Sequence, residues 1–167
     1  TVSSAGFRTA VKDALTQAGA GDNFGAKPVF DEKTDETIDT DIVVVALDKE
    51  DKVVYAKWDV AQIYEGVTDT KGERKEAYNM KGVSAQMGVI AGGAEWYEQA
   101  EFLEKYVLNK TAGEVAAIET KERDASHTTV PAGADLTAGC TMNIGEFKDA
   151  IAKACAKNDC TMVCIST

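Results

Sequence analysis

The 167-residue chain has few prolines, few basic residues and a single histidine. It holds two prolines, and 18 lysines and arginines against 28 aspartates and glutamates give a net charge of -10. An acidic surface repels phosphate backbones, so the composition argues against nucleic-acid binding. No run of about 18 apolar residues is present, so the sequence predicts no membrane-spanning helix.

Cysteine is absent until the last 28 residues, which hold all four: Cys140, Cys155, Cys160 and Cys164. Their spacing lacks the paired C-x-x-C of a zinc ribbon, and only one histidine exists as an alternative ligand. We therefore expect no metal site. The two remaining interpretations are disulfides, which would suit an exported protein, and ordinary reduced thiols.

Two apolar segments separated by a short polar connection dominate the middle of the chain. Residues 37–47 (TIDTDIVVVAL) and 53–63 (VVYAKWDVAQI) read as strands, and DKEDK between them predicts a hairpin. In the second strand Val54, Ala56, Trp58 and Val60 alternate with polar or exposed positions, which indicates one buried face. The first strand is apolar in both phases over residues 43–45, as is typical of a central strand.

Helical periodicity is clearest at residues 95–108 and 144–157, and a third helix is expected at 3–18. Trp96, Ala100, Leu103 and Val107 form an apolar stripe on the first of these. The run from Thr111 to Glu114 has the T-x-x-E form of a capping box and predicts a shorter helix. Together these elements predict an α+β fold, a small antiparallel sheet around the 37–63 hairpin packed by the helices near 95–108 and 144–157.

The segments between these elements are expected to be irregular. Residues 19–36 are glycine-rich and then acidic, which indicates a loop and a linker over 21–36 between a leading helix (1–20) and the domain proper (37–160). Residues 64–93 show little periodicity, and a third short strand with a flexible approach to the next helix is expected there. The polar stretch 119–135 reads as a loop.

The end of the chain resembles its beginning at an offset of 140 residues. The stretch from Thr141 aligns with the stretch from Thr1, and it places Phe147 on Phe7, Ala150 on Ala10, Ile151 on Val11 and Ala154 on Ala14. This period is the size of a domain, far longer than a solenoid repeat. It predicts tandem copies in a parent protein, with this chain opening on the tail helix of the preceding copy.

The segment from Asp135 to Phe147 (DLTAGCTMNIGEF) is a candidate phosphate site. A glycine-containing turn delivers Thr141 just ahead of a helix, whose first turn carries unpaired N–H groups and a partial positive charge. Gly139 removes the Cβ that would block close approach. A phosphate, or a phosphate ester on the Thr141 hydroxyl, would be stabilised at such a place.

The same segment resembles the flavin-attachment motif of FMN-binding domain proteins, roughly D-x-x-S-G-A-T-x-[ST] before a helix. Asp135, Gly139 and Thr141 match in register. The resemblance implies FMN joined to the threonine through a phosphoester bond made by a separate flavin transferase, and a redox partner. Ala138 and Asn143 depart from the pattern.

Two further features belong to this resemblance. Cys140 also departs from the motif, since it replaces an alanine. The opening TVSSAGF is closer to the end of the motif, with Thr1 as the acceptor, although its preceding aspartate and S-G-A are absent from the chain. The implied site therefore comprises Asp135, Gly139, Thr141 and Thr1.

A second resemblance covers residues 35–157, which look like exported repeat proteins or lipoproteins of anaerobic, mostly Gram-positive bacteria. The shared features are the hairpin ending in D-V-A-Q, the E-W-Y-E-Q segment and a V-P-x-x-x-D-L-T segment before the last helix. The resemblance implies an extracytoplasmic location. Two functions follow as hypotheses: an FMN-binding-like domain in electron transfer, or a non-catalytic surface repeat used as a spacer or for adhesion.

Other candidates are weaker. Trp58, Trp96, Tyr97 and Tyr78 could stack on a non-covalently bound flavin, although each is more often a core residue. His127 lies in a polar loop near Asp124 and Asp135 without a nucleophile elbow, so a solvated loop histidine is the better interpretation. The acidic residues between Asp31 and Asp41 lack EF-hand spacing and read as a solvated face.

Overall fold

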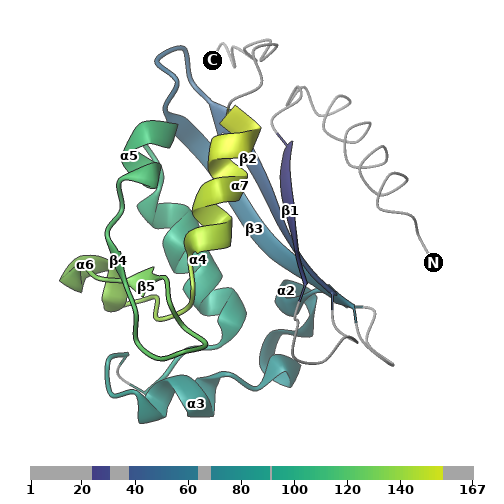
Figure 1. Cartoon of the computed structure of the whole chain (residues 1–167), viewed down its shortest axis with the longest axis vertical. Coiled ribbons are helices and arrows are strands. Elements are labelled where there is room, and N and C mark those ends of the chain that lie inside the picture. The colour runs from purple at the N-terminus through teal and green to yellow at the C-terminus, as the bar shows by residue number, and fades with distance from the viewer. Residues whose placement is uncertain (1–23, 31–37, 64–68, 91, 156–167) are drawn as a thin grey trace.

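The computed structural model describes residues 24–30, 38–63, 69–90 and 92–155 (Figure 1). In this part of the chain a three-stranded antiparallel sheet of order β1-β2-β3 is followed by helices. The elements are β1 (Phe24–Phe30), β2 (Ile38–Leu47), β3 (Val53–Ile63), α2 (Lys71–Arg74), η1 (Lys75–Tyr78), α3 (Lys81–Gln86), α4 (Trp96–Tyr106), α5 (Ala112–Ala116), β4 (Thr120–Lys121), β5 (Val130–Pro131), α6 (Ala134–Thr137) and α7 (Gly145–Cys155). The α+β fold class expected from the sequence is confirmed.

The predicted hairpin is confirmed, and β2 is the central strand. Asp48 fixes its turn, because its Oδ1 accepts the N–H groups of Glu50 at 2.8 Å and Lys52 at 3.0 Å. The bonds from the Lys52 and Glu50 N–H groups, together with the nearby charges of Lys52 and Lys49, lower the pKa of Asp48. Asp48 therefore stabilises the turn, since aspartate side chains commonly accept hydrogen bonds from the backbone N–H groups of a turn.

One expectation within the hairpin is wrong. Val54 was expected on the buried face, but 46% of it is exposed and Val53 is buried instead. The register shifts here, because Ala46 pairs with Tyr55 while Leu47 pairs with Val53. Val54 is the extra residue of a β-bulge, which moves it off the face that the alternation assigned to it.

The expected loop over residues 19–36 is also wrong in part, because residues 24–30 form the edge strand β1. Its register with β2 places Ala26 opposite Ile42 and Pro28 opposite Thr40. Proline lacks an N–H and is confined to edge strands, where one side of the ladder is unpaired. The leading helix expected at 3–18 lies outside the described residues.

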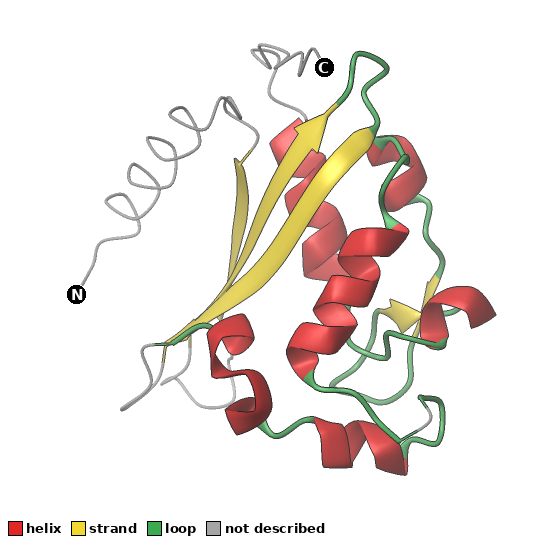
Figure 2. Ribbon diagram, turned by 180° about the vertical axis from the view of Figure 1, so that it is seen from behind, coloured by secondary structure: helices red, strands yellow, loops and turns green. Residues whose placement is uncertain are grey.

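The helices α4 and α7 cover one face of the sheet, as the views from the front and from behind both show (Figures 1 and 2). The predicted stripe of α4 is buried: Trp96, Ala100, Leu103 and Val107. The inner face of α7 is equally buried: Phe147, Ala150, Ile151 and Ala154. Both helices thus have the apolar faces that their 3.6-residue periodicity predicts.

The described residues between the hairpin and α4 form short helices and turns, and the short strand expected within 64–93 is not found among them. Thr70 starts α2 with a capping box: its Oγ1 accepts the Glu73 N–H at 3.1 Å, and Glu73 Oε2 accepts the Thr70 N–H at 2.9 Å. Asp59 adds to the cap by accepting the Gly72 N–H at 2.9 Å and the Thr70 hydroxyl at 2.6 Å. The T-x-x-E signal was present in the sequence.

A tight turn leads from α3 into α4. Ser84 is fully buried, and its Oγ donates to the Ala94 carbonyl at 2.8 Å and accepts the Ala94 N–H at 2.7 Å. Gly93 has a φ of +72°, and a Cβ there would overlap the Lys81 carbonyl. Gly93 is therefore a backbone requirement of this turn.

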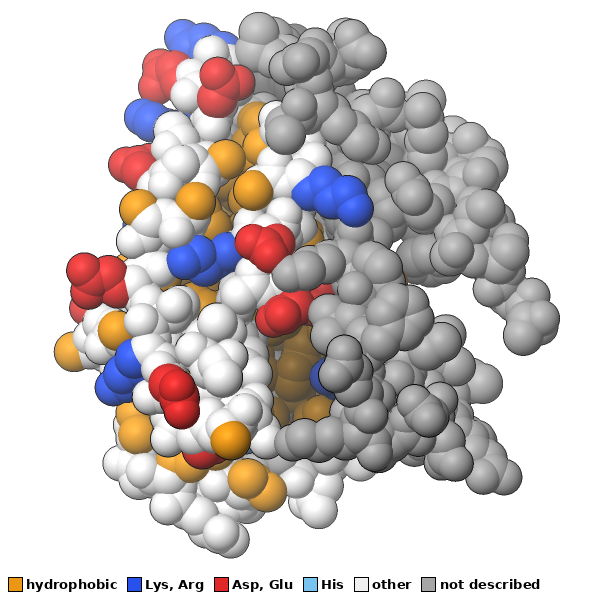
Figure 3. Space-filling view, in the orientation of Figure 1, with side chains coloured by type: hydrophobic (Ala, Val, Ile, Leu, Met, Phe, Trp, Pro, Cys, Tyr) orange, Lys and Arg blue, Asp and Glu red, His pale blue; other side chains and the backbone are white. Residues whose placement is uncertain are grey.

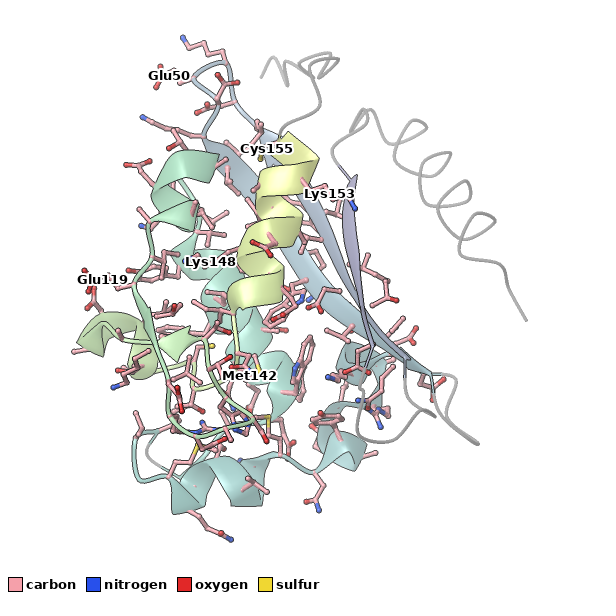
Figure 4. All side chains as sticks on the ribbon, viewed as in Figure 1. Glu50, Glu119, Met142, Lys148, Lys153 and Cys155 are labelled. Carbon is pink, nitrogen blue, oxygen red and sulfur yellow. The ribbon has the colours of Figure 1, made fainter. Side chains whose placement is uncertain are left out.

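Residues 111–137, which connect α4 to α7 and which we call the strap, lie beside these two helices (Figure 1). The capping box at Thr111 and Glu114 is confirmed as the start of α5. The loop expected over 119–135 contains the two-residue strands β4 and β5 and the single turn α6. Lys148 of α7 donates to the Ile118 carbonyl at 2.6 Å and joins the strap to the helix (Figure 4).

On the described face shown in Figure 3, acidic and basic side chains are interspersed. Among the described residues, no helix combines the length and the apolar character that a bilayer crossing requires.

Within the described sheet, β3 is an edge strand, and some of its outward N–H groups bond to other parts of the chain. Glu104 of α4 accepts the Trp58 N–H at 2.8 Å and pairs with Lys57 at 3.2 Å. At the hairpin end, Val53 donates to the Lys110 carbonyl and accepts the Asn109 N–H. Covered edges protect against pairing with other chains.

We predict that Glu104→Ala lowers the free energy of unfolding by about 2 kcal/mol, because it leaves the buried Trp58 N–H without a partner. It should also cause concentration-dependent association through the uncovered edge. Urea unfolding and light scattering measure the two effects. Glu101→Ala, an exposed position on the same helix, is the control. Equal midpoints for the two variants would show that the edge bond contributes nothing.

Candidate functional site

Thr141, the expected flavin acceptor, is buried in a hydrogen-bond network. Only 6% of it is exposed. Its hydroxyl donates to Gln99 Oε1 at 3.2 Å, and its N–H donates to the same oxygen at 2.9 Å. Its carbonyl accepts Nη1 of Arg123 at 2.8 Å. Each polar group of Thr141 therefore has a partner inside the protein.

The other motif residues are used for packing or lie apart from Thr141. A Cβ at Gly139 would overlap the Phe102 ring, so the glycine is required by the contact with α4. Asp135 is exposed in the first turn of the four-residue helix α6. Thr1 lies outside the described residues. Of the described motif residues, Asp135, Gly139 and Thr141 line neither of two surface hollows, one beside α5 and α6 and the other between β3 and α4.

Two N–H groups at the start of α7, where a phosphate was expected to bind, are bonded to Thr129. Ile144 donates to the Thr129 carbonyl at 3.1 Å and Gly145 to Thr129 Oγ1 at 3.3 Å. Asn143, a departure from the flavin motif, positions this contact because its Oδ1 accepts the Thr129 N–H at 3.1 Å. In this arrangement the residues do not fit a flavin phosphoester, because the Thr141 hydroxyl is enclosed and bonded to Gln99, and Thr129 already accepts two of the N–H groups at the helix start.

Cys140, next to Thr141, has no reactive character. The residue is buried, and burial raises the pKa of its thiol to about 11. Since the thiolate is the nucleophile and the metal ligand, this cysteine is inert at neutral pH. Cys160 and Cys164 lie outside the described residues, and the disulfide hypothesis for them stays a prediction.

His127 belongs to a turn between β4 and β5. Its Nδ1 lies 2.7 Å from Asp124 Oδ1, which also accepts the Ser126 N–H at 3.0 Å. The hydrogen bond from His127, with that from Arg123, lowers the pKa of the exposed Asp124 to about 2. These contacts close a turn, in agreement with a loop histidine. Among the described residues, no three acidic, histidine or cysteine side chains are placed to hold a metal ion.

Three of the four aromatic residues suggested for ligand stacking do meet at one cleft. A hollow of about 280 Å³ opens between β3, the α2–η1 segment and α4, and we call it the aromatic cleft. Trp58, Trp96 and Tyr97 line it, with Lys57, Lys75 and Glu101 at its sides. Tyr78 is not in its lining; its ring lies under the Arg74 guanidinium, 4.5 Å from ring centroid to Cζ. Sequence analysis identified these aromatic residues as candidates, but it could not show that they line the same cleft.

A buried carboxylate supports the floor of the aromatic cleft. Asp41 Oδ1 accepts the indole N–H of Trp58 at 2.7 Å, and only 5% of Asp41 is exposed. Burial raises its pKa to about 6, although the indole hydrogen bond and Lys71 oppose the shift and Glu146 and Asp39 add to it. Sequence analysis could not identify this buried carboxylate, because Asp41 is one of the acidic residues that were predicted to form a solvated face.

Comparisons with protein-family models, with curated proteins and with solved structures find no match for this chain. We therefore propose a function from the geometry of the described residues.

Proposed function

We propose that the chain is an FMN-binding-like repeat domain of an extracytoplasmic protein that acts as a non-catalytic module, a spacer or an adhesion unit. The observation that carries the proposal is the enclosure of Thr141, whose hydroxyl is bonded to Gln99. A transferase that joins FMN to a threonine must reach that hydroxyl. In this fold the hydroxyl supports the packing of α4 against the segment that enters α7.

Residues of the flavin motif segment support the same proposal, because Gly139 and Asn143 also have structural roles here. Gly139 admits the Phe102 ring, and Asn143 bonds the backbone of Thr129. A repeat that has lost its cofactor is expected to keep the motif positions that packing requires. The matching segments at Thr1 and Thr141 support tandem copies, in which such a unit would separate or present other domains.

The second candidate function is electron transfer by FMN, favoured by the in-register match of Asp135, Gly139 and Thr141 and by the motif-like opening at Thr1. It requires a flavin transferase and a redox partner. The cofactor would supply the redox chemistry, and the protein its attachment.

Intact-mass measurement on the protein isolated from its native host separates the two functions. We expect an unmodified mass and no visible absorbance. A mass increase equal to one FMN, with yellow colour, would overturn the proposal. Thr141→Val and Thr1→Ala in the same host then identify the acceptor, because the added mass disappears only in the variant that lacks it.

A further inference from the structure

We propose that the aromatic cleft binds a small amphoteric molecule with an apolar ring, of the class of a free aromatic amino acid. This inference is independent of the module's role in the parent protein. It depends on the shape, the fixed walls and the paired charges of the cleft.

The aromatic lining consists of the half-buried Tyr97 ring and the edges of Trp58 and Trp96, which are 3% and 5% exposed and are held in place from behind. The ring centroids of Trp58 and Trp96 lie 5.0 Å apart at an angle of 56°, and Phe147 packs 5.1 Å from Trp58. Asp41 fixes the Trp58 indole by its hydrogen bond. Ala100, one turn after Trp96 on α4, contributes only a methyl group and leaves the space that a larger side chain would fill. Tilted aromatic edges of this kind favour another ring.

The walls are joined to each other across the cleft. Tyr97 of α4 donates its hydroxyl to Glu76 of η1 at 3.1 Å. Asp59 of β3 holds the start of α2 through the Gly72 N–H. The three elements that form the cleft are thus connected without a ligand, so little ordering is required on binding.

Charges of both signs surround the aromatic lining. The lining contains two lysines and three carboxylates: Lys57, Lys75, Asp59, Glu73 and Glu101. Lys57 pairs with Glu104, and Asp59 and Glu73 bond the start of α2, so Lys75 and Glu101 are the charges at the rim that a ligand would meet. A molecule that carries one charge of each sign can satisfy both, whereas a phosphate ester would meet three carboxylates. The volume of about 280 Å³ lies just below the range of roughly 300 to 1,000 Å³ of most small-molecule sites, which indicates a ligand smaller than a nucleotide.

Intrinsic fluorescence tests this proposal directly, because both tryptophans of the chain line the cleft. Titration with L-phenylalanine should change the emission in a saturable manner, and calorimetry should give the same affinity. Phenethylamine and 3-phenylpropionate, which each lack one charge, should bind at least about tenfold more weakly. Absence of saturable binding to phenylalanine in the millimolar range would overturn the proposal, as would equal affinity for all three compounds.

Variants at the exposed rim localise the binding without disturbing the core. Lys75→Ala and Glu101→Gln should each weaken phenylalanine binding several-fold. Lys49→Ala in the hairpin turn and Glu119→Gln on the strap are the matched controls, since both residues are exposed and lie outside the cleft lining. Unchanged affinity in both rim variants would show that the ligand binds elsewhere.

Discussion

Asp41→Asn is expected to stabilise the protein by roughly 3 kcal/mol at neutral pH, an unusual outcome for a substitution in a core. The reason is that the folded protein encloses a carboxylate that water would solvate better. Burial raises the pKa of Asp41 from 3.8 to about 6 against the opposing effect of the Trp58 hydrogen bond. A pKa difference of about two corresponds to roughly 3 kcal/mol between the charged and neutral forms.

The pH dependence follows from the sign of this shift. The folded state holds the Asp41 proton more tightly than the unfolded state, so its contribution to stability is full below about pH 4 and is lost as the pH rises through about 6. Asparagine keeps an oxygen that accepts the Trp58 indole N–H and cannot ionise. The variant and the wild type should therefore have similar stability at about pH 3 and diverge up to about pH 7.

Urea unfolding at intervals between these pH values measures the difference. Asp69→Asn, at an exposed aspartate, is the control for the change in net charge. Its stability should follow the wild-type curve. If Asp41→Asn also follows that curve, the buried carboxylate does not lower the stability, and the explanation given for its pKa is wrong.

Local periodicity was sufficient to predict the central elements of the fold. The β2–β3 hairpin, α4 and α7 bury residues at a period of two or 3.6, and their described bounds lie within two residues of those read from the sequence. Val54 shows the limit of this reasoning within an element. The bulge that exposes it depends on how the turn joins two strands, which alternation does not encode.

Elements specified by distant contacts could not be predicted in this way. The seven residues of β1 contain a glycine and a proline and show no alternation, and they form a strand because β2 offers them a free edge. The turn before α4 depends on Ser84, which bonds the backbone of Ala94 ten residues later. Short helices such as α2 have little propensity of their own and depend on capping.

In the candidate site, too, some features could be predicted from the local sequence and others depend on distant contacts. Sequence reasoning identified Thr141 as a hydroxyl ahead of a helix and identified Trp58, Trp96 and Tyr97 as a potential stacking surface. It could not show that Thr141 is enclosed, since its partner Gln99 lies 42 residues earlier. The convergence of the aromatic residues likewise depends on the packing of α4 against β3. The sequence shows which residue types are present. Whether their side chains are accessible depends on the tertiary structure.

Gln99 is the residue whose loss should destabilise the fold most among the substitutions considered. It is fully buried, and its side chain reaches two segments far apart in the sequence. Its Oε1 accepts both groups of Thr141, and its Nε2 donates to the Ala94 carbonyl at 3.1 Å. Through these bonds α4 fixes both the turn before it and the segment that leads into α7.

Gln99→Leu should lower the free energy of unfolding by about 3 kcal/mol, because it leaves the Thr141 N–H without a partner in the interior and removes the acceptor of the hydroxyl. Leucine has a similar size, so loss of hydrogen bonding rather than a cavity should dominate. Gln86→Leu, at an exposed glutamine on α3, is the control and should change the stability by less than about 0.5 kcal/mol. Equal unfolding midpoints for the two variants would contradict the prediction.

A double-mutant cycle separates the hydroxyl from the backbone bond. Thr141→Val alone should cost about 1 kcal/mol, the net value of one buried hydrogen bond. In the Gln99→Leu background the hydroxyl no longer has its acceptor, so the same change should cost nothing or add stability. Additive effects would mean that the Thr141 hydroxyl is not held by Gln99. The enclosure that argues against flavin attachment would then lose its support, so this stability measurement also bears on the function proposed for the domain.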